Sequence, residues 1–122
     1  MPATKRLIVL ISHGVNDRTQ SAHQKQTMHL LVTLKVPHEL VDGMDPDQKE
    51  RRNALFQISD IRGNYPQFFF ENEDGSIIFY GKWEKVQDLN ETRDLPEEIL
   101  QQYPDMETWD RVFGNLVESF SS

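Results

Sequence analysis

The chain has 122 residues, no cysteine and a net charge of −7. This length predicts one domain, because most domains have about 100 to 150 residues. The charge is uneven: residues 93–122 carry 2 Lys and Arg against 7 Asp and Glu, a net charge of −5, which leaves −2 for residues 1–92. Such an acidic chain argues against nucleic acid and anionic membranes as partners, since both are negatively charged.

The hydropathy pattern and the missing cysteines indicate a compartment. No stretch of even ten residues is continuously apolar, so neither a signal peptide nor a membrane-spanning helix is expected. Because the chain cannot form a disulfide, we expect a reducing, cytoplasmic environment.

The first half of the chain predicts a strand, a helix, a second strand and a second helix. A short apolar run within residues 6–12 indicates a central strand that is buried on both faces. A helix is expected over residues 19–35 and a short strand over 38–43. Asp45 as a cap and Pro46 in the first turn favour a second helix within residues 44–59. The residues expected to face inward are Thr27, Leu30, Leu31 and Leu34 on the first helix, and Ala54, Leu55 and Ile58 on the second.

The second half predicts a hairpin and a third helix. Strands over 67–71 and 76–81 are joined by Asp74-Gly75, which suits a tight turn. A helix follows over 82–91, with Trp83, Val86 and either Leu89 or Asn90 on one side. Pro66 stands directly before a strand, where proline is tolerated, and we expect the Tyr65–Pro66 bond to be cis. The order of elements predicts an α/β, thioredoxin-like fold with a mixed four-stranded sheet.

Residues 93–122 form an acidic extension with its own pattern. A short helix is expected within 95–103, and an amphipathic helix over 105–121. Its apolar face either packs on residues 1–92 or binds a partner, and the first alternative is favoured because most such faces are buried against their own chain. The apolar residues at helical spacing are Met106, Trp109, Phe113, Leu116, Val117 and Phe120.

Residues 5–92 carry a family resemblance. The segments "SHGVNDRTQSAHQKQ", "DPDQKERRNALF", "PQFFFENE" and "YGKWEKVQDLNE" resemble the SH3-binding glutamic acid-rich protein-like family, a cysteine-poor branch of the glutaredoxins. The resemblance implies a thioredoxin-like (glutaredoxin-like) domain over 1–92, followed by the helical extension over 93–122. It also implies that residues 13–18 take the place of Cys-x-x-Cys, where a helix N-terminus stabilises a thiolate. None of Ser12, His13, Asn16 and Thr19 can form a stable thiolate or a disulfide, so dithiol exchange is excluded and no enzymatic activity is expected.

The resemblance also implies where a ligand would bind. In glutaredoxins the residues at the cis proline bind the backbone of glutathione, and the turn after the fourth strand binds its γ-glutamyl end. The matching candidate groove here consists of Ser12, His13, Tyr65, Pro66, Gly81, Lys82 and Trp83.

Other chemistry is less well supported by the sequence. His13, His23, His29 and His38 lack the spacing of metal ligands, and neither a metal nor another cofactor is expected. Ser12 and His13 are neighbours at a strand end, where side chains point to opposite sides, so a nucleophile and base pair is not favoured. The basic residues Lys49, Arg51 and Arg52 suit either a solvent-exposed helix face or a binding site for a phosphate or an acidic peptide.

These observations favour a function in binding. We expect a redox-inactive protein-interaction module or adaptor with a protein partner that the sequence does not identify. The alternative is a non-catalytic binder of glutathione or a short peptide at the cis-proline groove. An SH3 domain, the partner in the family's name, is not expected, because the chain has no P-x-x-P and SH3 ligands need paired prolines in a polyproline II helix.

Overall fold

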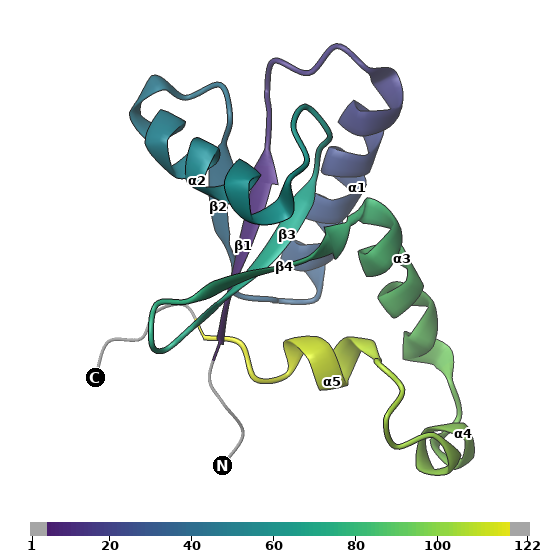
Figure 1. The fold of residues 1–122 in the computed structure, drawn as a ribbon. Helices are drawn as coiled ribbons and strands as arrows, with labels where there is room; N and C mark the ends of the chain where they lie inside the picture. The colour runs from purple at the N-terminus through teal and green to yellow at the C-terminus, as the bar shows by residue number, and fades with distance from the viewer. Residues whose placement is uncertain (1–4, 118–122) are drawn as a thin grey trace.

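The computed structural model describes residues 5–117 and contains one four-stranded sheet with helices on both faces (Figure 1). The strand order is β2-β1-β3-β4. β1 pairs in parallel with β2 and antiparallel with β3, which pairs antiparallel with β4. This confirms the predicted mixed four-stranded sheet, and the arrangement is compatible with a thioredoxin-like fold. The strands are β1 (Lys5–Ile11), β2 (Glu39–Asp42), β3 (Gln67–Asn72) and β4 (Ile77–Lys82).

Three longer helices cover the sheet. In Figure 1 α2 lies on one face, whereas α1 and α3 lie on the other. Two short helices follow in the C-terminal extension, and a 3-10 turn precedes α2 and another follows α3. The helical elements are α1 (Arg18–Thr33), η1 (Pro46–Gln48), α2 (Lys49–Ser59), α3 (Trp83–Glu91), η2 (Thr92–Asp94), α4 (Glu97–Gln102) and α5 (Trp109–Phe113).

The central strand β1 separates two apolar clusters. Ile8 and Leu10 pack toward α2, together with Leu55 and Phe56 of that helix. Alternate residues of the same strand point to opposite faces, so its other side chains join the second cluster. That cluster contains Leu7, Val9, Ile11, Leu31, Val36, Phe68, Phe70, Val86, Leu89, Trp109 and Phe113. Burial of β1 on both faces confirms its prediction as a central strand.

The predicted inward face of the second helix is partly wrong. Leu55 is buried as expected, but its neighbour Phe56 is the second buried residue, while Ala54 and Ile58 are exposed. The α-helix begins only at Lys49, after the 3-10 turn, so its faces are not in phase with one continuous helix from Pro46. Burial of a phenyl ring also gains more free energy than burial of a methyl group.

The predicted helix over 105–121 is also wrong in length. α5 spans only Trp109–Phe113, between its N-cap Thr108 and Gly114. The chain then extends along the start of β1, where the Val117 N–H donates to the Lys5 carbonyl at 2.9 Å. Glycine disfavours a helix interior, and a free strand edge offers the chain an alternative partner. Residues 118–122, with the predicted Phe120, lie outside the described part of the chain.

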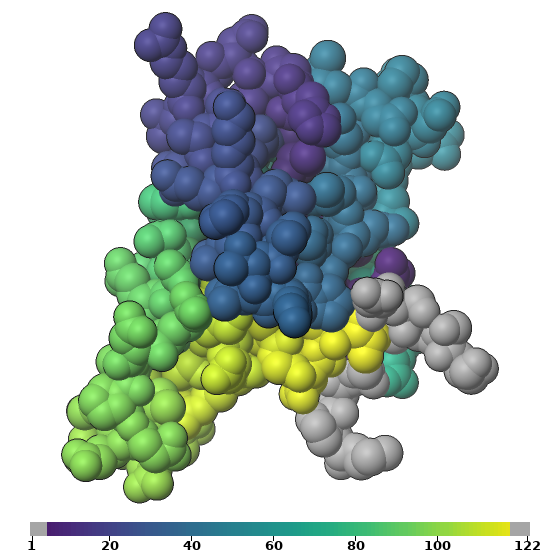
Figure 2. Space-filling view, turned by 180° about the vertical axis from the view of Figure 1, so that it is seen from behind, coloured from purple at the N-terminus to yellow at the C-terminus, as the bar shows by residue number. Residues whose placement is uncertain are grey.

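The extension packs against the sheet through α5. Trp109 and Phe113 are each 5% exposed, and their rings meet edge to face with centroids 4.7 Å apart. Figure 2 shows this segment, in yellow, lying directly against the blue surface around residues 34–37. Arg111 fixes the preceding loop, because its guanidinium donates to three backbone carbonyls, those of Leu100 (2.9 Å), Tyr103 (2.8 Å) and Met106 (2.9 Å).

Helix α1 ends at a strained residue, which gives a testable prediction. Lys35 has φ +56°, and Val36 N–H donates back to the Leu31 carbonyl at 2.9 Å, a common helix-ending motif that favours glycine. Lys35→Gly should therefore raise the free energy of unfolding by about 0.5 to 1 kcal/mol and Tm by about 2 to 4 °C, measured by thermal and urea denaturation. The control Lys25→Gly, at an exposed interior position of α1, should lower it by about 1 kcal/mol. Equal effects at both positions would contradict the assignment of strain to Lys35.

Candidate functional site

The N-terminus of α1 is capped by a carboxylate of the chain itself. Asp17 precedes the helix, and its Oδ1 accepts the Gln20 N–H at 2.9 Å. The positive end of a helix dipole favours a negative charge at this position. The Asp17 carboxylate supplies this negative charge.

The end of β1 is held by a buried glutamine of α1. The Ser12 N–H donates to Gln24 Oε1 at 2.6 Å, and Gln24 Nε2 donates back to the Ser12 carbonyl at 3.1 Å. Both residues are buried, so each backbone group of Ser12 needs a partner inside the protein. Gln24 was not predicted as a site residue, although it lies three and seven residues before the buried Thr27 and Leu31. A glutamine in phase with a buried helix face was the available signal.

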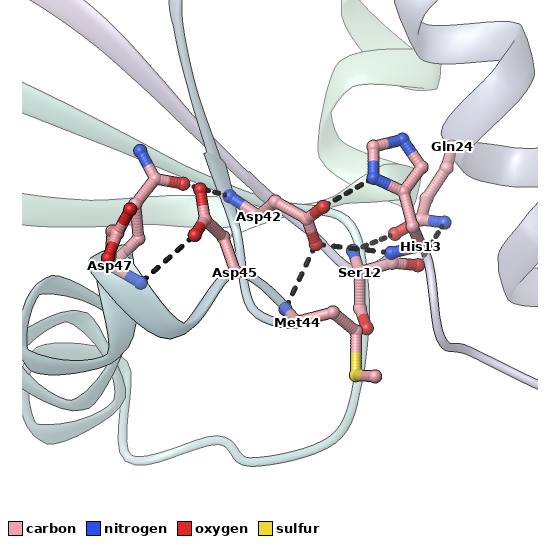
Figure 3. Close-up of polar contacts among 8 residues, drawn as sticks. Ser12, His13, Gln24, Asp42, Met44, Asp45 and Asp47 are labelled. Atoms are coloured by element: carbon pink, nitrogen blue, oxygen red, sulfur yellow. Dashed lines mark hydrogen bonds and ion pairs between the residues drawn. The ribbon is translucent and has the colours of Figure 1, made fainter.

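The side chains of His13 and Asp42 contact each other across the ends of two parallel strands (Figure 3). The His13 ring Nδ1 contacts Asp42 Oδ2, while the backbone N–H groups of His13 and Met44 donate to Asp42 Oδ1 at 3.2 and 3.0 Å. Burial raises the pKa of Asp42, but the hydrogen bonds from Met44 and His13 together outweigh it and leave the pKa below its ordinary value. Asp42 therefore stays ionised and orders the loop after β2.

Asp42 should contribute to stability at neutral pH and lose that contribution in acid. A lowered pKa in the folded state stabilises the fold above the unfolded pKa of 3.8, and this stabilisation disappears as pH falls through the folded pKa. We expect Tm to fall less between pH 6 and pH 2 in Asp42→Asn than in the wild type. Asp88→Asn, on an exposed part of α3, is the matched control and should behave like the wild type. An unchanged pH profile in Asp42→Asn would contradict the assignment.

The Tyr65–Pro66 bond is cis, which confirms the prediction. Pro66 is fully buried, and the Tyr65 N–H donates to Gln20 Oε1 of α1 at 2.9 Å. Burial raises the pKa of the Tyr65 hydroxyl, and the negative charge of Asp42 raises it further, while Arg52 opposes both effects. The Tyr65 N–H beside the cis proline therefore already has a partner within the chain.

The turn after β4 also contacts α1, through a pair of stacked rings. Trp83, the first residue of α3, stacks on the His23 ring with centroids 3.6 Å apart and planes within 2° of parallel. Gly81 lies so close to Lys85 that a Cβ added to this glycine would come within 2.7 Å of the Lys85 Cβ. Lys82 provides the N-cap position of α3, without a side-chain capping bond.

Helix α1 is thus the common partner of the three parts of the predicted groove. Its side chains Gln24, Gln20 and His23 contact Ser12, Tyr65 and Trp83, respectively. A pocket of about 380 Å³ lies beside α1, but of the seven predicted groove residues it includes only Ser12 and His13. Its other lining residues are Ile11, Val15, Ser21, Gln24, Lys25 and Met28.

The basic residues of α2 mostly have partners within the chain. Arg51 pairs with Glu39 at 2.5 Å, and Arg52 donates to the Gly43 carbonyl at 3.0 Å and to the Asn53 side chain. Both guanidinium groups therefore stabilise the connection between β2 and α2.

Within residues 5–117, no three side chains of the metal-binding types gather into a group. Over the same range, none of the helices has the length and apolar character needed to cross a membrane.

Comparisons of the chain with protein-family models, curated proteins and solved structures gave no significant match. The family resemblance therefore rests on the sequence segments that carry it.

Proposed function

We propose that this chain is a redox-inactive, thioredoxin-like protein that acts as a protein-interaction module or adaptor in the cytoplasm. One observation carries the proposal: two side chains of α1, Gln20 and Gln24, bind the backbone N–H groups beside the cis proline and at the end of β1, while Asp17 caps the first turn of α1 itself. A site built to hold a thiol or a peptide would leave such donors available to its ligand. The compatible sheet order and the resemblance of residues 5–92 support the same proposal.

Exposed apolar side chains support a function in protein binding. Leu40 on β2 is 38% exposed and Met44 in the following loop is 60% exposed, and both are large enough to anchor a partner. Co-purification with the intact chain, compared between the wild type and Met44→Asp, tests whether this surface holds a partner. A panel of SH3 domains should show no binding, because the chain has no P-x-x-P.

The chain should show no oxidoreductase activity. Thiol–disulfide exchange requires an attacking thiolate, and the chain has no cysteine to provide one. In assays of insulin reduction and of glutathione-dependent disulfide reduction, turnover should equal the rate without protein. A redox-active glutaredoxin serves as the positive control. Turnover clearly above background would contradict the proposal.

A titration with glutathione separates the proposal from its alternative, a non-catalytic ligand groove at Tyr65, Pro66, Gly81, Lys82 and Trp83. Millimolar glutathione should shift neither the amide resonances of Tyr65 and Gly81 nor the fluorescence of the tryptophans. The variant Gln20→Ala frees the Tyr65 N–H and is the matched comparison. Saturable shifts in the wild type would favour the alternative.

A further inference from the structure

Helix α1 meets different surroundings on its two sides. On one side, Gln20 and His23 contact the residue before the cis proline and the first residue of α3. The pocket of about 380 Å³ lies along another side, and it contains none of the predicted groove residues beyond Ser12 and His13. Spacings of three and four residues place its helix residues on one face of α1. These residues are Ser21, Gln24, Lys25 and Met28.

The pocket contains a buried hydroxyl without a partner. Ser12 lines the pocket and is only 5% exposed. Its backbone N–H and carbonyl are both bonded to the Gln24 amide (Figure 3), but its hydroxyl makes no hydrogen bond to any residue from 5 to 117. Buried polar groups normally have a partner, because loss of hydration without one is unfavourable. The Ser12 hydroxyl is therefore available to donate a hydrogen bond to a ligand.

The charge at the pocket favours an anion. Lys25 is exposed and forms no ion pair in the part of the chain that the structure describes, and no residue three or four positions away from it on α1 is acidic. The eight lining residues include no Asp or Glu, although the chain as a whole has a net charge of −7. Asp42 contacts the lining residue His13 but is not itself part of the lining. A cation and a hydroxyl donor without a competing acid suit a carboxylate.

The rest of the pocket is largely apolar. Ile11 is 5% exposed, and Val15 and Met28 are both partly buried. A methionine side chain is flexible and adapts to the shape of a ligand. A mostly apolar pocket of about 300 to 1,000 Å³ with a few polar groups at fixed positions is the usual form of a small-molecule site. These residues therefore suit a ligand that has a hydrocarbon part as well as a charge.

We propose that this pocket binds a small monocarboxylate with a hydrocarbon chain. The Ser12 hydroxyl donates to the carboxylate, Lys25 supplies the compensating charge, and the hydrocarbon chain covers Ile11, Val15 and Met28. A single unpaired lysine balances one negative charge, so a dianion such as phosphate fits less well. The inference goes beyond the proposed adaptor function and does not depend on it, because it uses none of the residues at the cis proline.

Octanoate is a suitable probe, and two analogues separate the parts of the proposal. In titrations of the full chain followed by amide chemical shifts, octanoate should shift the resonances of Ser12, Val15 and Lys25 but not those of Tyr65 and Gly81. The shifts should saturate with Kd at or below about 1 mM. Octanamide lacks the charge and acetate lacks the chain, so each should bind at least about tenfold more weakly. Absence of saturable shifts, or equal affinity for octanoate and octanamide, would overturn the inference.

Two substitutions test the roles of the polar groups. Ser12→Ala keeps both backbone bonds to Gln24 and should raise Kd for octanoate about tenfold, because a hydrogen bond to a charged group is lost. Lys25→Gln should raise Kd only about two- to fivefold, since Lys25 is exposed. Lys49→Gln, at an exposed position of α2, is the matched control and should bind like the wild type. Unchanged affinity in Ser12→Ala, or equal affinity in the two lysine variants, would overturn the inference.

Discussion

Phe113→Ala should lower the free energy of unfolding by about 3 to 5 kcal/mol, one of the largest expected effects of a single substitution in this chain. Phe113 is only 5% exposed, and its ring packs between Trp109 and Phe70 of β3 at centroid distances of 4.7 and 6.3 Å. The substitution removes apolar burial and leaves a cavity beneath the sheet, and both effects destabilise the fold. Urea denaturation followed by circular dichroism gives the value.

The control for this prediction lies on the same extension. Tyr103 is 57% exposed, and its hydrogen bond with Arg111 uses the backbone carbonyl, so Tyr103→Ala should change stability by no more than about 0.5 kcal/mol. Phe113→Ala should also increase the binding of a hydrophobic dye, since loss of the ring exposes the apolar face of β3. A change below about 1 kcal/mol in Phe113→Ala would show that the extension is not part of the core in solution.

Gln24→Leu should lower the free energy of unfolding by about 2 to 4 kcal/mol, although leucine is apolar and similar in size. The amide of Gln24 is a partner of both the N–H and the carbonyl of Ser12, and both residues are buried. Each buried backbone group left without a partner costs about 1 to 3 kcal/mol, which the added apolar surface of leucine offsets only in part.

An exposed glutamine on the same helix provides the matched comparison. Gln26→Leu should change stability by no more than about 0.5 kcal/mol, since Gln26 faces solvent. In Gln24→Leu the amide resonances of Ser12 and His13 should shift and exchange faster with solvent, because the end of β1 loses its anchor. Equal stability of the two variants would indicate that water replaces the Gln24 amide.

The sheet and the longer helices could be predicted because their signals are local. The apolar run before Ser12 defines the central strand, and Asp74-Gly75 defines the hairpin, where Gly75 has φ +88°. The length of α5 could not be predicted, because it depends on the pairing of Val117 with Lys5, which is 112 residues away in sequence. Periodicity within the extension contains no information about that free strand edge.

The candidate site was less predictable than the fold. The resemblance predicted a groove at Tyr65, Pro66 and Trp83, but not the side chains of α1 that contact Tyr65 and Trp83. Gln20 is 45 residues from Tyr65 in the sequence, and a polar side chain at this position of a helix predicts exposure to solvent. Contacts of this kind depend on how α1 lies across the sheet, which no local pattern determines.

The pairing of Val117 with Lys5 has a consequence for handling the protein on a surface. Val117 lies beside Lys5 at the start of β1, whereas Ser12 and the cis proline are separated from Lys5 by the length of the strand, about 20 Å. A tether attached at Lys5 or at Val117 would therefore hold the molecule in the same orientation, with the N-terminal end of α1 pointing away from the support. Molecules coupled at these two positions should present the same face to soluble ligands, and so should molecules coupled at the hairpin turn, because the turn begins at Asn72, the partner of Lys5.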